Sequence, residues 1–191
     1  MPNFFTREYP NFFTDEMCDA YVSHFEETMV VDKEEVKKTS ICTGPVRPDG
    51  HQICGNCNCQ RMNPMGFDRF TYLNTMAINL FQEAIEKYKT DCQISNHQWP
   101  PGYGWEQFRM KRFLCDTGES FGAHVDVTSH DGAKRFLILM VYLNDDFEEG
   151  ETEFPLLGDK IKPEKGKLLV FPPMWTYLHH GNPPTNGYAK Y

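Results

Sequence analysis

The 191-residue sequence predicts an α+β fold in which N-terminal helices support a jelly-roll core, also called a double-stranded β-helix. Two observations favour this fold. Two stripes of apolar residues at helical spacing occupy the first half, and short apolar or alternating runs separated by Gly, Asp, Asn and Pro follow Pro100–Pro101. The length suits one core, so we expect a single domain over residues 1–191, with helical support in residues 1–100 and the jelly roll in residues 101–191.

The first predicted helix begins after Thr14, a suitable N-cap that is followed by two acidic residues. Apolar side chains then recur every four positions: Met17, Tyr21, Phe25 and Met29. This spacing places them on one face of an amphipathic helix, which we interpret as a packing helix.

A second helix is predicted over residues 67–90. Its apolar stripe consists of Phe70, Leu73, Ala77, Leu80, Phe81, Ala84, Ile85 and Tyr88. Between the two helices, residues 39–65 are rich in Gly, Pro, Asn and Cys and lack apolar periodicity. A loop of this length in a compact domain is usually functional or mobile, so we interpret residues 39–65 as a candidate lid.

The predicted strands lie in four segments: WEQFRMKRFL, KRFLILMVYLN, GKLLVFP and the run that closes at Tyr191.

The formal charge of −8, from 27 acidic and 19 basic residues, opposes binding of a polyanion, so we expect no nucleic-acid partner. The N-terminus MPNFFTREYPNFF lacks a signal pattern, and no stretch approaches the roughly 18 apolar residues of a membrane span. We therefore expect a soluble cytoplasmic protein without a membrane partner.

The first chemical signal is His124-Val125-Asp126. On a strand, residues i and i+2 point to the same face, so the imidazole and the carboxylate can reach one metal ion. The spacing by itself fits a satisfied surface pair equally well, and the surrounding sequence has to distinguish the two interpretations.

Four segments surround this pair in order: RFLCDTGESFGAHVDV, RFLILMVYLNDDFEEGETEF, IKPEKGKLLVFP and HHGNPPTNGYAKY. They contain a Gly six positions before the His-x-Asp, a YLN strand end, a GET-F turn, a P-x-x-G-x-L hairpin and a distal His followed by Pro and Gly. In this order they resemble the prolyl 4-hydroxylase family of 2-oxoglutarate oxygenases. The segment NFFTDEMCDAYV is similar, more loosely, to the opening helix of that family.

The resemblance implies Fe(II) bound by His124, Asp126 and His179, with 2-oxoglutarate as cosubstrate and O2 as oxidant. Two His and one carboxylate leave open positions on the iron, as in other non-haem iron oxygenases. A catalytic zinc site also uses three protein ligands, and the resemblance favours iron. Related halogenases have a small residue in place of Asp126, so hydroxylation is the implied reaction.

The distal ligand is open between His179 and His180, because only one of two adjacent strand residues faces the metal. The family pattern places Pro four and Gly eight residues after the ligand, which Pro183 and Gly187 match when counted from His179. The family's basic residue lies ten after the ligand, whereas Lys190 is eleven after His179. An extra residue in the turn, or a β-bulge, before Lys190 would reconcile the two counts.

The resemblance assigns the distal carboxylate of 2-oxoglutarate to Lys190, assisted by the phenol of Tyr142. A buried carboxylate needs a cation and hydrogen-bond donors. The alternatives are a solvated lysine and a tyrosine that fills the barrel. Many relatives also have a Tyr before the position of Gly118, and this chain has Phe113, Leu114 and Cys115 there. Relatives usually continue beyond the position of Tyr191, which leaves open a shortened sequence.

Four of the seven cysteines fall between residues 42 and 59. We predict one zinc ion bound by Cys42, Cys54, Cys57 and Cys59, with His51 as a reserve ligand. Zinc would hold a segment that has little apolar content and covers the substrate. Free thiols and disulfides remain alternatives, and Cys18, Cys92 and Cys115 have apolar neighbours typical of core positions.

The implied activity is hydroxylation of a C–H bond, with prolyl residues of a peptide or protein as the leading substrate. Aromatic side chains that line a groove suit extended proline-rich chains. The candidates are Trp99, Tyr103, Trp105, Trp175 and Tyr177. The alternatives are a hydroxylase of a free amino acid or small molecule, and a non-catalytic metal-binding jelly-roll module. The oligomeric state is not determined by the sequence.

Overall fold

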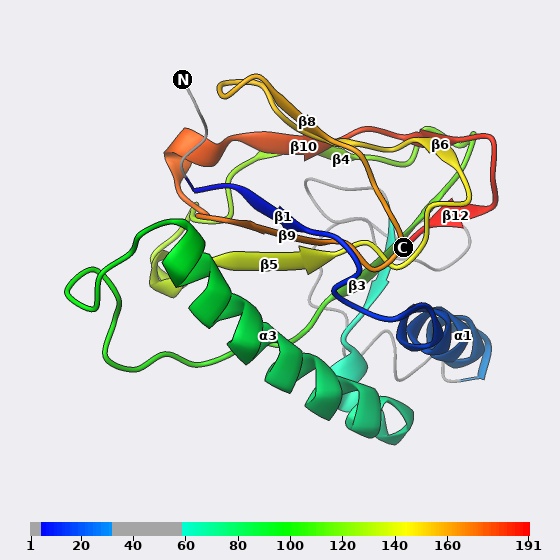
Figure 1. Ribbon diagram of the computed structural model, residues 1–191. Helices are drawn as coiled ribbons and strands as arrows, with labels where there is room; N and C mark the ends of the chain where they lie inside the picture. Colours follow the sequence, from blue (N-terminus) through cyan, green and yellow to red (C-terminus); the bar gives the residue numbers. More distant parts are fainter. Residues whose placement is uncertain (1–4, 32–58) are drawn as a thin grey trace.

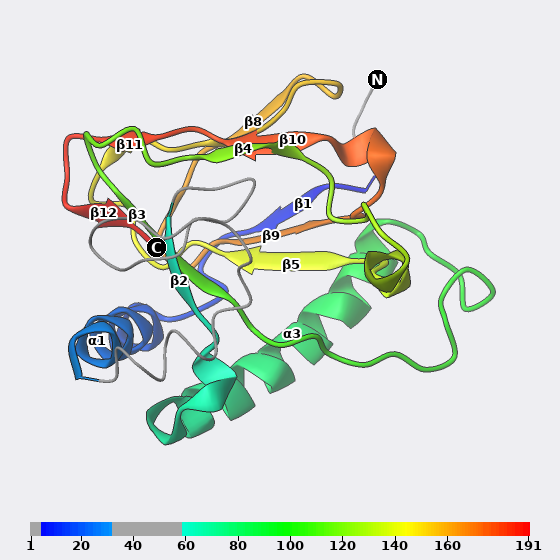
Figure 2. The ribbon, with the colours of Figure 1, turned by 180° about the vertical axis from the view of Figure 1, so that it is seen from behind.

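The computed structural model describes residues 5–31 and 59–191. They form two layers of antiparallel β-sheet, and the two long helices lie on the outer side of one layer (Figure 1, Figure 2). This architecture is the α+β fold with a jelly-roll core that the sequence predicted. No helix among the described residues has the length and apolar character needed to cross a membrane.

The strands fall into four sheets. The helix-covered layer contains β1 (Arg7–Tyr9), β9 (Leu168–Phe171) and β5 (Ile138–Val141), in that order. The opposite layer contains β4 (Phe121–His124), β10 (His179–Gly181), β7 (Thr152–Phe154) and β8 (Asp159–Ile161). A third sheet contains β12 (Ala189–Lys190), β3 (Met110–Leu114) and β2 (Gln60–Met62), and β11 (Pro184–Thr185) pairs with β6 (Glu148–Glu149).

The helices α1 (Asp15–Val31) and α3 (Thr71–Asp91) confirm the two predicted stripes. The Thr14 hydroxyl accepts a hydrogen bond of 3.2 Å from the Met17 amide, as an N-cap does. The α3 helix begins later than predicted because two short 3-10 helices precede it. Two further 3-10 turns lie in the barrel, and the four are η1 (Pro64–Gly66), η2 (Asp68–Phe70), η3 (Asp131–Lys134) and η4 (Trp175–Tyr177).

The central strand β9 separates two apolar clusters, because successive side chains point to opposite faces of a sheet. Leu168 and Val170 pack with the side chains of α1 and α3. Leu169 and Phe171 pack in a second cluster with Tyr142, Phe154, Ile161 and Tyr177. The helices therefore brace one face of this sheet, and the opposite face forms the inside of the barrel.

Two of the described strands lie in residues 1–100, where only helices and a loop were predicted. β1 pairs with β9, and β2 pairs with β3. The prediction of an uninterrupted loop over residues 39–65 is therefore wrong for β2, and residues 1–100 contribute strands as well as helices. Both strands are three residues long, REY and QRM, which is too short for a recognisable alternation.

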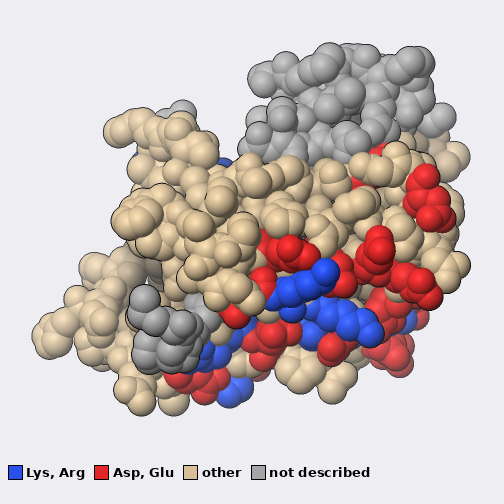
Figure 3. Space-filling view, turned by 90° about the horizontal axis from the view of Figure 1, so that it is seen from above, with Lys and Arg blue, Asp and Glu red and all other residues tan. Residues whose placement is uncertain are grey.

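The outer face of the β4-β10-β7-β8 sheet is turned towards the viewer in Figure 3, where acidic and basic side chains lie next to one another. Lys160 forms ion pairs with Glu153 at 3.0 Å and with Glu151 at 3.7 Å. Asn182 donates a further hydrogen bond to Glu153 at 2.7 Å. Opposite charges are thus paired on this face.

Candidate metal centre

The strands β4 and β10 bring three ligand-type side chains together. His124 lies opposite His179 in the pairing of the two strands, and Asp126 follows two residues after His124. The Asp126 amide donates to the carbonyl oxygen of Pro173 at 3.1 Å, which fixes the backbone where the strand ends. One ligand atom from each of the three lies within 4.8 Å of those of the other two. This distance suits a shared metal ion.

The pairing of β4 with β10 contains an irregularity beside these residues. His179 lies opposite His124, but Gly181 lies opposite Phe121, so β4 has one extra residue. This bulge is on β4, so it does not test the extra residue that the sequence count placed before Lys190. The His180 side chain instead lies 3.5 Å from Glu153. Of the two adjacent histidines, the structure places His179 with His124.

Backbone carbonyls fix the orientation of both imidazoles. The Nδ1 atom of His124 lies 2.8 Å from the oxygen of Gly122, and that of His179 lies 2.9 Å from the oxygen of Tyr177. A carbonyl oxygen only accepts, so each Nδ1 carries the hydrogen and each Nε2 keeps a lone pair. Both Nε2 atoms are therefore available as ligands.

Burial keeps the two imidazoles neutral. It lowers the pKa of His124 to about 4, with a further contribution from the neighbouring His179, and burial likewise lowers the pKa of His179. His124 Nε2 and Asp126 Oδ2 are buried and lack a hydrogen-bond partner among the residues that the structure describes. Such atoms are costly to leave unpaired, and a bound cation would satisfy them. The three side chains thus fit a divalent metal.

Arg135 supports the carboxylate ligand from outside. It donates one hydrogen bond from Nη1 to the Asp126 carbonyl oxygen at 2.7 Å and another from Nε to Glu106 at 2.7 Å. The hydrogen bond from Arg135, together with its charge, holds the pKa of Glu106 below its ordinary value. Arg135 therefore links the backbone of a ligand to the loop that carries Glu106. Its role was not recognised in the sequence, where it is one arginine among many.

A cavity of about 840 Å³ opens from the three ligand-type side chains and contains Lys190. Lys190 is buried, and its ammonium donates to the Gly150 carbonyl oxygen at 2.6 Å. Burial and, to a smaller extent, the charge of Lys111 together lower the pKa of Lys190 to about 8, and the charge of Glu151 opposes the shift. Lys190 is thus an internal cation rather than a solvated charge.

Gly150 makes this contact possible. Its φ of +71° lies in the left-handed region, and a Cβ added there would lie 2.9 Å from the Phe147 ring and 3.3 Å from Cδ of Lys190. A larger residue would therefore displace the lysine that the cavity contains.

Tyr142 lines the same cavity, with its ring centroid 5.5 Å from the Lys190 ammonium. Its hydroxyl donates to the Thr152 hydroxyl at 2.7 Å, and burial raises its pKa above the ordinary value. Tyr142 therefore keeps its proton and can act as a donor. Thr152, which sequence reasoning missed, also faces the cavity, and its alternation with buried Phe154 on β7 was the available signal.

The aromatic residues predicted to line a groove divide into two groups. Tyr103 and Trp105 line the cavity together with Phe136, and Trp99 packs edge-on against Phe136 with ring centroids 5.2 Å apart. The prediction is wrong for the other two: Trp175 is 77% exposed and lies apart from the cavity lining, and Tyr177 is buried in the cluster between the sheets.

The predicted zinc site lies mainly outside the described residues, because Cys42, His51, Cys54 and Cys57 are not among them. Cys59 is described, and it is buried next to Phe113 and Phe121. Of the cysteines expected in the core, Cys18 and Cys115 are buried and Cys92 is half-buried.

Comparisons with known proteins agree with this geometry. Residues 108–191 match the 2OG-Fe(II) oxygenase superfamily. A curated protein of Acanthamoeba polyphaga mimivirus, named "Putative prolyl 4-hydroxylase", is 35% identical over a region that covers 38% of this chain. That region is 32% of the viral protein, so the chain matches about a third of its length.

Solved structures share the fold across nearly the whole chain. Viral collagen prolyl hydroxylase from Paramecium Bursaria Chlorella virus-1, in its 2OG complex, has a TM-score of 0.61 at 22% identity, covering 97% of this chain and 91% of that one. A Pseudomonas putida prolyl-4-hydroxylase has a TM-score of 0.58 at 17% identity, with coverages of 97% and 88%. A Trichoplax adhaerens prolyl hydroxylase with a hypoxia inducible factor peptide fragment has 0.64 at 14% identity, with coverages of 98% and 82%.

Proposed function

Because residues 108–191 match the 2OG-Fe(II) oxygenase superfamily, we propose that this chain is a dioxygenase that hydroxylates prolyl residues in a peptide or protein. One observation carries the proposal. The side chains of His124, Asp126 and His179 converge at a cavity that also contains the buried Lys190 ammonium. A cluster of ligand-type side chains and a buried cation thus line one cavity.

His124 and His179 would hold Fe(II) through Nε2, and Asp126 through its carboxylate. When bound, the iron would supply the oxidation chemistry, in which O2 and 2-oxoglutarate are consumed to give succinate and CO2 and a substrate C–H becomes C–OH. The ligand side chains are oriented before the metal binds. The Gly122 and Tyr177 carbonyls orient the imidazoles, so the metal does not have to order them when it binds.

Lys190 and Tyr142 would bind the distal carboxylate of 2-oxoglutarate. A charge-assisted hydrogen bond from a buried ammonium is among the stronger polar contacts in a protein. The Tyr142 hydroxyl donates to Thr152 in the present structure, so on binding it would redirect its hydrogen to the carboxylate and accept one from Thr152. The cosubstrate would then extend from the anion site to the metal.

The rim of the cavity supports an extended peptide as substrate. Tyr103, Trp105 and Phe136 line the cavity as an aromatic surface. Proline-rich segments adopt an extended helix without internal hydrogen bonds and dock on aromatic grooves. Two of the structural neighbours are prolyl hydroxylases of cellular organisms, and one of these was solved with a peptide.

The test is succinate release from 2-oxoglutarate by the Fe(II)-loaded protein, measured with proline-containing peptides, free amino acids and no substrate. We expect release to depend on a proline-containing peptide, with a mass gain of one oxygen on that peptide. Release with a free amino acid alone would favour the small-molecule alternative. Lack of a visible charge-transfer band with anaerobic Fe(II) and 2-oxoglutarate would favour a non-catalytic binding module.

A further inference from the structure

The strand that carries Lys190 is held from both sides by different means. β12 is an edge strand of the sheet β12-β3-β2, and Lys190 pairs there with Phe113 of β3. On the other side of β12, the side-chain amide of Asn144 donates to the Ala189 carbonyl oxygen at 2.7 Å and accepts from the Tyr191 amide at 2.8 Å. The amide of Asn144 thus takes the place of a neighbouring strand at the two residues that flank Lys190.

We propose that Asn144 is a positioning residue for the cosubstrate, because it fixes the peptide groups on both sides of Lys190 and thereby aims the ammonium at the distal carboxylate. The inference rests on the proposed role of Lys190. Asn144 itself touches the backbone of β12 and acts through it.

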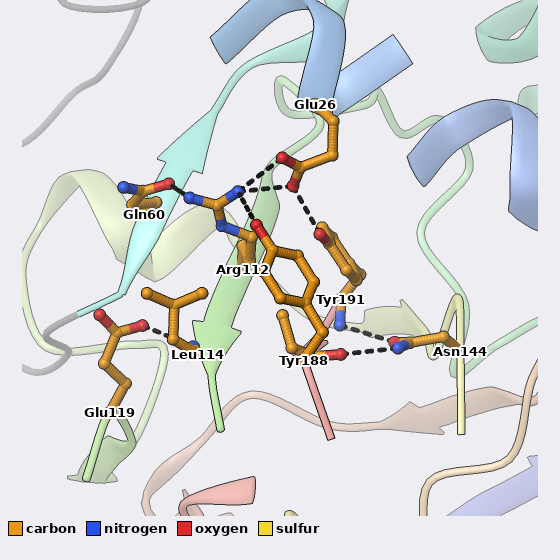
Figure 4. A network of polar contacts seen from close by, with 9 residues as sticks. Glu26, Gln60, Arg112, Leu114, Glu119, Asn144, Tyr188 and Tyr191 are labelled. Atoms are coloured by element: carbon orange, nitrogen blue, oxygen red, sulfur yellow. Dashed lines mark hydrogen bonds and ion pairs between the residues drawn. The ribbon is translucent and has the colours of Figure 1, made fainter. Parts of the chain in front are cut away.

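A second set of contacts supports the same strand (Figure 4). The Tyr191 carbonyl oxygen accepts from the Leu143 amide at 3.2 Å. The Tyr191 hydroxyl donates to Glu26 of α1. Glu26 also accepts two hydrogen bonds from Arg112 of β3, at 2.6 and 2.7 Å. Tyr191, which follows Lys190, is therefore hydrogen-bonded to α1 through Glu26, and the same carboxylate binds Arg112 of β3.

The orientation of the Asn144 amide is determined by its partners. Nδ2 also donates to the Asp146 carboxylate at 2.6 Å, and a carboxylate only accepts. Nδ2 therefore faces two acceptors, and Oδ1 faces the Tyr191 amide. Both backbone partners require this orientation.

The lysine needs such a support because a buried ammonium is unstable without an anion. Burial lowers the pKa of Lys190, which means that the charged ammonium is less stable in the cavity than in water. Its strand has only two residues, so few backbone contacts oppose that movement. Holding both flanking peptide groups keeps the cation inside the cavity before the cosubstrate binds, and such preorganisation raises affinity.

The test compares two ligands by calorimetry on protein loaded with Mn(II) in place of Fe(II). 2-Oxoglutarate has the distal carboxylate, and 2-oxopentanoate has the same 2-oxo acid end without it. We expect Lys190→Met to raise the Kd for 2-oxoglutarate roughly 10- to 100-fold and Asn144→Ala to raise it about tenfold. Neither variant should change the Kd for 2-oxopentanoate. The double variant should bind 2-oxoglutarate about as weakly as Lys190→Met, since both changes remove the same contact.

Asn74→Ala is the matched control. Asn74 is likewise an asparagine whose amide both accepts and donates: it is buried, accepts from the Tyr21 hydroxyl at 3.1 Å and donates to the Pro64 carbonyl oxygen at 3.3 Å. Its removal should lower stability and leave the Kd for 2-oxoglutarate unchanged. If Asn144→Ala does not fold, Asn144→Asp replaces it, because the carboxylate has the same size and still accepts from the Tyr191 amide. It loses the donor to Ala189, so it too should raise the Kd for 2-oxoglutarate alone.

Two results would overturn the inference while leaving the Lys190 anchor intact. One is an unchanged Kd for 2-oxoglutarate in both Asn144 variants alongside a raised Kd in Lys190→Met. The other is an equal loss of affinity for both ligands in the Asn144 variants, which indicates general damage to the cavity. An unchanged Kd in Lys190→Met would instead refute the proposed anchor and, with it, the positioning role.

Discussion

Binding of 2-oxoglutarate should weaken as the pH rises through about 8, because Lys190 loses its proton in this range before the cosubstrate arrives. An ordinary lysine has a pKa of 10.5, and burial of Lys190 is the main cause of the decrease. The positive charge of Lys111 adds to the decrease, and Glu151 and Cys59 oppose it. The distal carboxylate binds the charged form of Lys190.

The sign and the size follow from linkage. Below the pKa Lys190 is already charged, so the Kd should be independent of pH. Above it, each pH unit leaves a tenfold smaller charged fraction, and the Kd at pH 9 should be about tenfold higher than at pH 7. Bound 2-oxoglutarate stabilises the charged form, so one proton should be taken up per binding event at the higher pH.

Calorimetry on the Mn(II)-loaded protein between about pH 7 and pH 9 measures both the Kd and the proton uptake. Lys190→Met should bind weakly and lose the slope. Lys111→Met should move the onset of weakening to higher pH, because one of the charges that lowers the pKa of Lys190 is gone. A flat Kd in the unchanged protein, or the same slope in Lys190→Met, would refute the reasoning.

Three further predictions concern the metal centre, the core and the cysteines. His179→Ala should abolish Mn(II) binding in calorimetry, whereas His180→Ala should preserve it because His180 faces Glu153; the reverse result would show that the distal ligand was misassigned. Leu168→Ala should lower the free energy of unfolding by about 2–5 kcal/mol in urea titration, because Leu168 is fully buried in the helix-covered cluster, and a loss below about 1 kcal/mol would contradict that packing. Protein purified without added metal should contain about one zinc ion, less in Cys57→Ser, and full activity without zinc would leave the cysteines as loop residues.

The sequence predicted the helices better than the strands, for a physical reason. The stripe of α1 is repeated over several turns, so each apolar residue supports the assignment of the next. Strands β1 and β2 have three residues each, and their pairing partners are distant in sequence. Their conformation depends on β9 and β3, which the local pattern does not contain.

The metal centre could be predicted from the sequence because the type and spacing of its ligands are local properties. His124 and Asp126 are two residues apart, and a strand brings such residues to one face. The resemblance of the last segments to a known family supplied His179 and Lys190 as candidates. Those residues, the two helices and the jelly-roll class are what the sequence determined by itself.

The tertiary structure decided the supporting contacts. Asn144 donates a hydrogen bond to the Ala189 carbonyl oxygen, which is 45 residues away in the sequence. Arg135 donates one to the Asp126 carbonyl oxygen, which is 9 residues away. It also placed His179 rather than His180 beside His124, through the register of β10 against β4. Side chains that bond to backbone distant in sequence carry no spacing pattern, because the path of the chain in space determines their partners.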